Sequence, residues 1–172
     1  ADLVVVTGSQ ANVRAGYSSG TPALGVGAGN VVSIVDETAD IADAAAKIAA
    51  SKTFDNATSC SSENAVIAVD AVYDKLVAAL AAEGGYCLDA AQTAHLEGIH
   101  WHNGKLTSKL LAKDIDVVLA ETGFAGTAPD NTSFLVAPQS EFGPDHPMTG
   151  EKMSRFLALH RAGDFDEAME KA

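Results

Sequence analysis

The sequence has little of several residue types that mark particular protein classes. Its 172 residues include two cysteines, Cys60 and Cys87, which are too few for the disulfide framework of a small secreted domain. The first residues show no secretory signal pattern, so we expect a reducing, cytoplasmic environment. No apolar run approaches the roughly 20 residues of a membrane-spanning helix, and we expect no membrane partner.

Basic residues are also scarce. Lys and Arg number 11 against 23 Asp and Glu, for a net charge of −12. An acidic chain lacks the positive surface that nucleic acids and anionic membranes attract, so we expect no nucleic-acid partner. The hydrophobic fraction is 47%, which excludes a disordered acidic tail. A chain of this length buries roughly 70% of its unfolded surface and forms one domain, or one domain and part of another.

Short apolar runs alternate with helical patterns along the chain. This alternation predicts an α/β fold with a mainly parallel sheet flanked by helices. Residues 20–30 hold four glycines and a proline, which predicts a loop, or a strand that another backbone approaches closely. The predicted strands cover 3–6, 31–35, 65–69, 133–137 and 156–159, and the predicted helices cover 10–17, a segment from Asp36 or Thr38 to Lys52, a segment from about Val72 to Gly84, 106–112, 115–121, and a last segment opening at Asp164.

Cys60 lies in a run of small polar residues, 58–62. Free cysteines are most often small buried hydrophobes, whereas a thiol on a polar loop is typical of a reactive nucleophile. The residues alone leave both interpretations open for Cys60. Cys87 stands between Tyr86 and Leu88, and these flanks favour an inert packing role.

Two segments carry a family resemblance. Residues 17–30 (YSSGTPALGVGAGN) and 52–63 (KTFDNATSCSSE) resemble the CoA-acylating branch of the aldehyde dehydrogenase superfamily. That branch includes the aldehyde dehydrogenase half of bifunctional aldehyde/alcohol dehydrogenases, and the surroundings of Cys60 most resemble acylating sulfoacetaldehyde dehydrogenases. The resemblance extends over nearly the whole chain and is weakest at 86–130.

The resemblance implies a fold, an activity and a set of partners. Residues 1–24 would be the tail end of the NAD-binding domain, and residues 25–172 the catalytic domain, truncated at the C-terminus. Cys60 would be the catalytic thiol of an enzyme that oxidises an aldehyde to an acyl-CoA. NAD or NADP would be the cofactor and coenzyme A the co-substrate. We expect a homo-oligomer, and we expect the isolated segment to be inactive because most of the cofactor domain lies outside it.

The position of Gly25 supports the acylating branch. Hydrolytic members of the superfamily carry a glutamate at the matching position, where it acts as general base for water. Without a base, water attacks a thioester slowly, whereas a second thiol needs less help because a thiolate is already a strong nucleophile. A glycine that serves only backbone geometry is the structural alternative, and the two explanations are compatible.

Further site residues follow from the same resemblance. Glu151, in Glu151-Lys152-Met153-Ser154, would bind the nicotinamide ribose hydroxyls, a pairing common in dinucleotide sites. Gly8 and Ser9, in the turn after the first strand, would lie near the cofactor pyrophosphate. Glu141 occurs in a similar string, but Glu151 is better placed before the strand at 156–159. No metal site is expected, because the spacing of His95, His100 and His102 matches no ligand set.

Two other function classes remain. The chain could be an assembly or binding module that keeps the fold without turnover, or a hydrolytic aldehyde dehydrogenase that makes a carboxylate. Cys60 and Glu151 favour the enzyme over the module, and Gly25 disfavours the hydrolytic enzyme.

Overall fold

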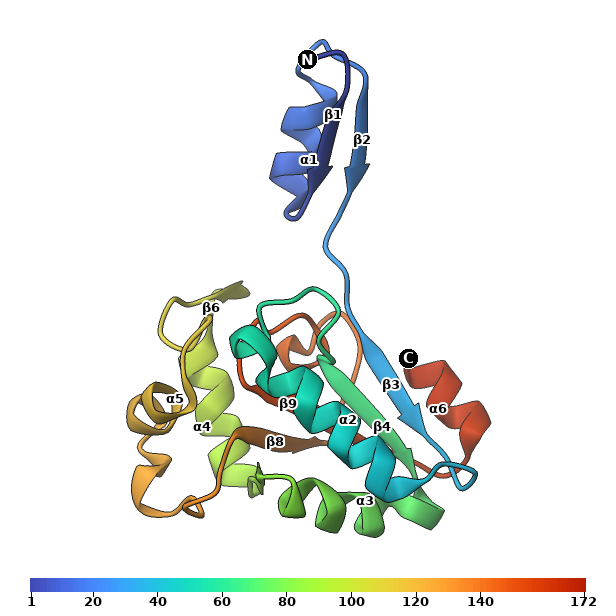
Figure 1. Cartoon of the computed structure of the whole chain (residues 1–172), viewed down its shortest axis with the longest axis vertical. Helices are drawn as coiled ribbons and strands as arrows, with labels where there is room; N and C mark the ends of the chain where they lie inside the picture. The colour runs from blue at the N-terminus through green and yellow to red at the C-terminus, as the bar shows by residue number, and fades with distance from the viewer. The chain divides into compact units, whose positions relative to one another are not determined.

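The computed structural model describes residues 1–172 and divides into two compact units, residues 1–30 and residues 31–172 (Figure 1). The division expected after residue 24 falls inside strand β2 (Ala23–Val26), which pairs with β1 (Val4–Thr7). The structural division therefore follows Asn30, at the end of the glycine-rich stretch.

The first unit is a β1-α1-β2 arrangement in which two parallel strands lie beside helix α1 (Gln10–Tyr17). At Gly25, an added Cβ would lie 2.6 Å from Cγ1 of Val13 and 2.9 Å from the Tyr17 ring. The Gly25 N–H also donates to the Tyr17 hydroxyl at 3.0 Å. Residues 23–26 are thus a strand, as the second of the two alternatives predicted, but side chains of helix α1 rather than another backbone approach it closely.

The second unit contains a five-stranded sheet in the order β3-β4-β9-β8-β5, and every neighbouring pair is parallel. The α/β class with a mainly parallel sheet is thereby confirmed. A two-stranded antiparallel hairpin, β6 and β7, stands apart from this sheet. The elements are β3 (Val32–Val35), α2 (Ile41–Thr53), η1 (Phe54–Ala57), β4 (Ala65–Val69), α3 (Asp70–Ala82), β5 (Gly85–Cys87), α4 (Ala90–His100), β6 (Trp101–His102), β7 (Lys105–Leu106), α5 (Ile115–Thr122), η2 (Phe124–Gly126), β8 (Phe134–Gln139), η3 (Pro147–Thr149), β9 (Phe156–Ala162) and α6 (Phe165–Lys171).

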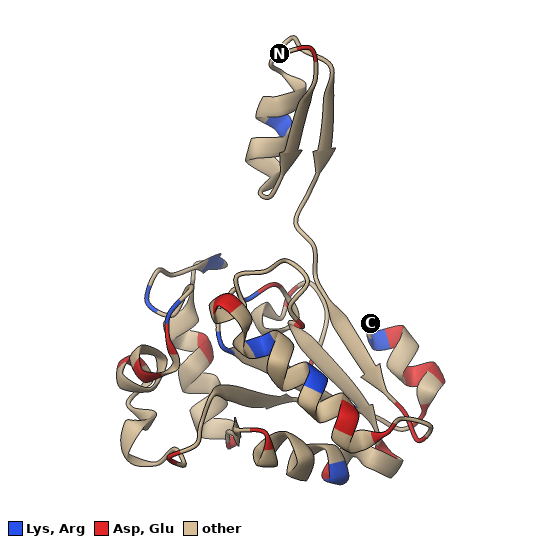
Figure 2. Cartoon of the chain, viewed as in Figure 1, with Lys and Arg blue, Asp and Glu red and all other residues tan.

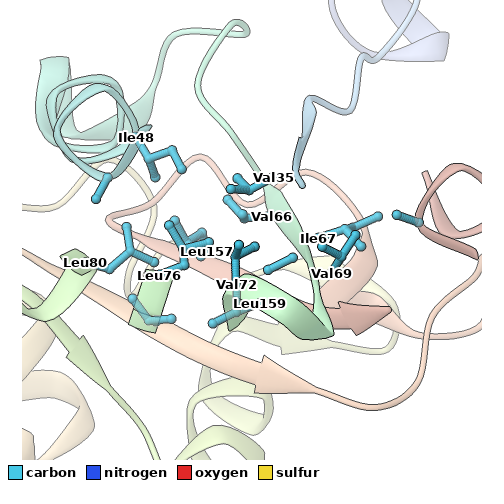
Figure 3. Packing of buried hydrophobic residues seen from close by; sticks show 14 of the residues in the cluster. Val35, Ile48, Val66, Ile67, Val69, Val72, Leu76, Leu80, Leu157 and Leu159 are labelled. Carbon is cyan, nitrogen blue, oxygen red and sulfur yellow. The ribbon is translucent and has the colours of Figure 1, made fainter. Parts of the chain in front are cut away.

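The main core lies on the central strands. All five residues of β4 are buried, as expected for a parallel strand covered on both faces. Figure 3 shows Ile48 of α2 and Leu76 of α3 in the same apolar cluster as Val66 and Leu157 of the sheet. Asp and Glu occur on helices and loops and on none of the five strands of this sheet (Figure 2). No helix is both long and apolar enough to cross a membrane.

Three local features differ from the prediction. Residues 106–112 are not a helix, because Thr107 bonds back to the α4–β6 segment through His100 O and Ile99 O, both at 2.8 Å. Helix α4 was missed, although Asp89 and Gln92 form a capping box at its start. Helix α2 is capped by Asp40, because the Asp36 carboxylate instead accepts from the nearby Thr38 N–H and hydroxyl.

Candidate active site

The Cys60 thiol is exposed at the tip of a turn that leads into the buried strand β4. The turn is closed by the Ser62 N–H, which donates to Ser59 O at 3.0 Å. Cys87, by contrast, lies half-buried on β5, and burial raises the pKa of its thiol. Because the thiolate is the reactive form of cysteine, the structure favours Cys60 over Cys87 as a nucleophile.

A buried lysine supports the Cys60 turn from inside. Lys52, in the last turn of α2, is fully buried, and its ammonium donates to Glu63 O at 2.9 Å and contacts the Ser62 hydroxyl at 3.4 Å. Burial lowers the pKa of Lys52 to about 8, although the Glu63 charge acts in the opposite direction. One Glu63 carboxylate oxygen is itself buried without a hydrogen-bond partner. Perturbed buried charges of this kind gather at functional sites.

Backbone strain precedes the thiol. Asp55, Asn56 and Ala57 have φ values of 47°, 53° and 58°, in the left-handed region that residues other than glycine seldom adopt. The Thr58 hydroxyl lies 2.7 Å from both the backbone carbonyl and the carboxylate of Asp55. Such strain persists only where the surrounding contacts impose it, and it occurs often at functional sites.

Glu151 is half-buried in the segment between η3 and β9, and its carboxylate makes no hydrogen bond or ion pair within the chain. The next residue, Lys152, is fully buried, and its ammonium donates to Met148 O and Gly150 O at 2.6 and 2.9 Å. Burial holds the pKa of Lys152 well below its ordinary value. The hydrogen bonds of the buried Lys152 ammonium therefore fix the backbone beside Glu151, while the Glu151 carboxylate stays available to a ligand.

Gly8 and Ser9 lie together at the start of α1 in the first unit. Gly8 has a φ of 118°, which a side chain would strain, and its N–H donates to Val26 O at 3.2 Å. The Ser9 hydroxyl caps the helix by accepting from the Asn12 N–H at 3.3 Å. Helix N-termini with free N–H groups favour anions.

The remaining candidates have structural partners. His100 is buried and packs edge-on against Trp101 and Phe156, with ring centroids 4.6 and 4.9 Å away. The exposed Glu141 lies 3.2 Å from Nδ1 of His146. No group of three or more His, Cys, Asp or Glu is placed to hold a metal ion.

Sequence reasoning missed the residues that hold the site in place. Lys52 shares a helix face with Ala45, Ile48 and Ala49, and its place on this buried stripe at helical spacing was the available signal. Three further residues, Asn56, Asn64 and Arg155, gave no such signal, because their hydrogen-bond partners lie far away in sequence. The Asn64 side-chain oxygen accepts from the Lys152 N–H, and the Asn56 side-chain oxygen accepts from Nε of Arg155.

Known proteins resemble the chain over nearly its whole length. No family model matches the chain. The acylating sulfoacetaldehyde dehydrogenase of Cupriavidus necator is 49% identical over 99% of the chain, which spans 35% of that protein's length. A solved acetylating aldehyde dehydrogenase from Geobacillus thermoglucosidasius superposes with a TM-score of 0.93 at 37% identity, over 99% of this chain and 37% of that one. The chain is similar to the CoA-acylating aldehyde dehydrogenases.

The similarity confirms the resemblance and the fold expected from the sequence. These relatives are oxidoreductases, and the chain spans about a third of their length. A further solved relative is the propionaldehyde dehydrogenase of Rhodopseudomonas palustris with bound CoA and an acylated cysteine, which superposes with a TM-score of 0.85 at 29% identity. That match covers 98% of this chain and 38% of the other.

Proposed function

We propose that the chain is the thiol-bearing part of a CoA-acylating aldehyde dehydrogenase, which oxidises an aldehyde to an acyl-CoA with NAD or NADP. The observation that carries the proposal is the exposed Cys60 thiol, presented on a turn fixed by buried Lys52. The similarity to acylating dehydrogenases over 99% of the chain supports it. In this proposal the unit of residues 1–30 belongs to the cofactor domain.

The chain's own residues divide the chemistry between them. Cys60 attacks the aldehyde carbon through its sulfur, and its backbone N–H donates to the oxygen that becomes negatively charged. Bound nicotinamide supplies the hydride acceptor. The resulting Cys60 thioester is then attacked by the thiolate of coenzyme A, so that the bond between the acyl carbon and the Cys60 sulfur breaks and Cys60 is restored as a thiolate. The unpartnered, half-buried carboxylate of Glu151 fits a pair of ribose hydroxyls.

Gly25 is consistent with coenzyme A, rather than water, as the acyl acceptor. A side chain at this position would begin against Val13 and Tyr17, so a glutamate here would meet helix α1 at once. A glutamate at residue 25 would require the side chains of Val13 and Tyr17 to shift. Because glycine supplies no general base at this position, coenzyme A remains as the acyl acceptor in our proposal.

The 49% identity to an acylating sulfoacetaldehyde dehydrogenase makes sulfoacetaldehyde the first substrate to assay. Lys52 and Arg155 contact the segment that carries Cys60, and both already donate hydrogen bonds within the chain. Lys52 binds Glu63 O, and Arg155 binds Asn56. We therefore propose that any recognition of a sulfonate relies on cations outside these two.

The test compares Cys60→Ala with Cys87→Ala in the full-length enzyme that carries this segment. We expect Cys60→Ala to abolish acyl-CoA formation and Cys87→Ala to leave it largely intact, because only Cys60 is exposed on a polar turn. Acyl-CoA and nicotinamide absorbance are measured with and without coenzyme A. An active Cys60→Ala enzyme contradicts the proposal, free carboxylate as the main product without coenzyme A supports the hydrolytic alternative, and no turnover by the unmutated enzyme supports the assembly module.

A further inference from the structure

The first observation concerns Asn56, which lies four residues before Cys60. Its side-chain oxygen accepts from Nε of Arg155 at 2.7 Å, and its side-chain nitrogen donates to the Asp114 carboxylate at 3.0 Å. Arg155 also donates to Thr53 O at 3.3 Å. The approach to the Cys60 turn is thus tied to a residue that lies four positions after Glu151.

The second observation concerns Asn64, which lies four residues after Cys60 and is buried. Its side-chain oxygen accepts from the Lys152 N–H at 3.0 Å. Its backbone is also held in the sheet, because its N–H donates to Val31 O and its carbonyl accepts from the Ala158 N–H. The exit from the Cys60 turn is therefore tied to the residue that follows Glu151.

The third observation is that residues with strained backbone lie in the segments that these hydrogen bonds join. Six residues other than glycine have positive φ, and five of them lie in three segments. Two of these segments bond directly, because the Ala112 N–H donates to Met153 O at 2.9 Å. Strain of this kind persists where the contacts around it over-determine the backbone. The five are Asp55, Asn56, Ala57, Ala112 and Met153.

Asparagine suits both positions. Its side chain offers a donor and an acceptor on a short stem, and it tolerates the left-handed conformation that Asn56 adopts. The Cys60 turn and the Glu151 segment, about ninety residues apart in sequence, are joined on both sides of the thiol.

We propose that Asn56 and Asn64 are positioning residues that hold the Cys60 turn in register with the Glu151 segment, and that they thereby set the placement of the thiol relative to the nicotinamide ribose. This inference rests on the proposed roles of Cys60 and Glu151. It predicts that the two asparagines matter for hydride transfer and much less for acyl transfer between Cys60 and coenzyme A, because acyl transfer needs no nicotinamide.

The tie itself is tested by hydrogen exchange in the full-length enzyme that carries this segment, with Asn56→Gly. Glycine accepts the left-handed backbone, so the change removes the side-chain bonds without adding strain. Asn103→Gly is the matched control, because Asn103 has a φ of 51° in the exposed turn between β6 and β7. We expect amides of residues 151–156 to exchange about tenfold faster in Asn56→Gly, the factor for the loss of one hydrogen bond to a charged group. Faster exchange confined to residues 53–62, or an equal effect in the control, overturns the tie.

The catalytic consequence is tested with Asn64→Leu, which keeps the size of the side chain and removes its acceptor. Two half-reactions are measured in the full-length enzyme: single-turnover hydride transfer from aldehyde, and acylation of Cys60 by an acyl-CoA without nicotinamide. We expect hydride transfer to fall by about tenfold to a hundredfold, as for a misplacement of about 1 Å, while the acylation rate changes by less than about threefold.

Asn64→Asp is the conservative variant, because a carboxylate oxygen still accepts from the Lys152 N–H, and we expect it to recover most of the hydride transfer. Equal losses in both half-reactions, or no loss in either, overturn the inference. If the unmutated enzyme acylates no cysteine, the proposed function fails instead, and the hydrogen-exchange comparison still decides whether the tie exists.

Discussion

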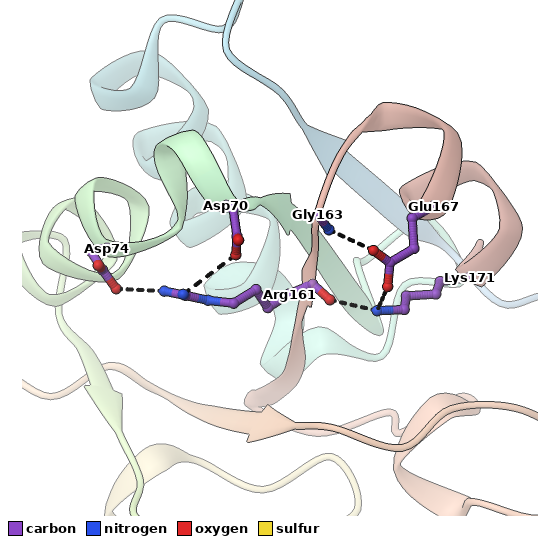
Figure 4. Close-up of polar contacts among 6 residues, drawn as sticks. All are labelled: Asp70, Asp74, Arg161, Gly163, Glu167 and Lys171. Atoms are coloured by element: carbon purple, nitrogen blue, oxygen red, sulfur yellow. Dashed lines mark hydrogen bonds and ion pairs between the residues drawn. The ribbon is translucent and has the colours of Figure 1, made fainter.

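The charged side chains at the two ends of the central strands differ in how far they are buried. At the amino ends of β4 and β9, Lys52 and Lys152 are fully buried and donate to backbone carbonyls. At the carboxyl ends, Arg161 lies between Asp70 and Asp74, and Lys171 pairs with Glu167 (Figure 4). The Arg161 side chain is 49% exposed and that of Asp74 is 89% exposed.

The difference shows where a substitution will matter. Exposed ion pairs contribute roughly 0–1 kcal/mol because water competes for both partners. A buried cation has lost its hydration, so it depends on the backbone carbonyls that accept its hydrogen bonds, and these bonds fix the backbone around it. The amino ends carry Cys60 and Glu151, and they also hold the strained residues. Buried charge and strain thus coincide with the candidate site, whereas the charges of Arg161, Asp70 and Asp74 at the carboxyl ends are about half exposed or more.

The largest expected effect comes from comparing Arg155→Met with Arg161→Met. Arg155 donates to Asn56 and Thr53 in a partly buried setting, so its loss leaves two acceptors without their charged donor. We expect a fall of about 2–3 kcal/mol in the free energy of unfolding, against about 1 kcal/mol or less for Arg161→Met. Urea unfolding measures both, and equal losses would show that the two ends do not differ as described.

A smaller effect is expected from His160, which lies on β9 between the two ends. It is buried with Nε2 unpartnered, and burial, aided by the charge of Lys152, lowers its pKa to about 4. The ordinary histidine pKa is about 6.5. Between these values the unfolded chain binds a proton that the folded chain does not, so stability falls as the pH drops through this window.

We expect His160→Gln to reduce this acid-dependent loss by on the order of 1–2 kcal/mol. A residual loss should persist, because burial also lowers the pKa of His100 to about 4. Melting temperatures at pH 7 and 4.5 measure the effect, with His102→Gln in the exposed β6–β7 hairpin as the control. If His160→Gln and His102→Gln both show the same pH dependence as the unmutated chain, burial does not lower the pKa of His160 as described.

The smallest effect is expected from Asp74→Asn at the carboxyl end. Asp74 lies 2.8 Å from Arg161, but Arg161 keeps Asp70 and stands 4.1 Å from the centre of the Tyr73 ring. We expect a change of less than about 0.5 kcal/mol that vanishes at about 1 M salt. Urea unfolding at low and high salt checks this, and a loss comparable to that of Arg155→Met would erase the contrast between the two ends.

The sequence predicted four strands of the five-stranded sheet but missed β5, and it predicted the connections less well. Apolar runs identified the strands at 65–69 and 156–159 because burial on both faces leaves a continuous hydrophobic signal. The capping residue Asp164 likewise predicted the start of α6. The prediction was poorest over residues 86–112. Helix α4 was missed although its capping box is a local signal, and the β6–β7 hairpin lies beside packing around Leu96 and His100 that local spacing does not encode.

The candidate site was predicted only in part. Cys60 and Glu151 were proposed from local strings and a family resemblance, since each lies in a short recognisable segment, and their roles stay predictions. Arg155 and Asn64 were not, because each acts through a bond to a partner almost a hundred residues away. Lys52 lay within reach of sequence reasoning, since a lysine on an otherwise apolar helix stripe predicts a buried cation.

Whether Cys60 carries the acyl group is decided by trapping that group on the protein. The full-length enzyme is incubated with an acyl-CoA and no nicotinamide, quenched in acid, digested and mapped by mass spectrometry. We expect the acyl mass on the peptide containing Cys60, with Cys87 unmodified. Acylation of Cys87 in place of Cys60, or of neither cysteine, would contradict it.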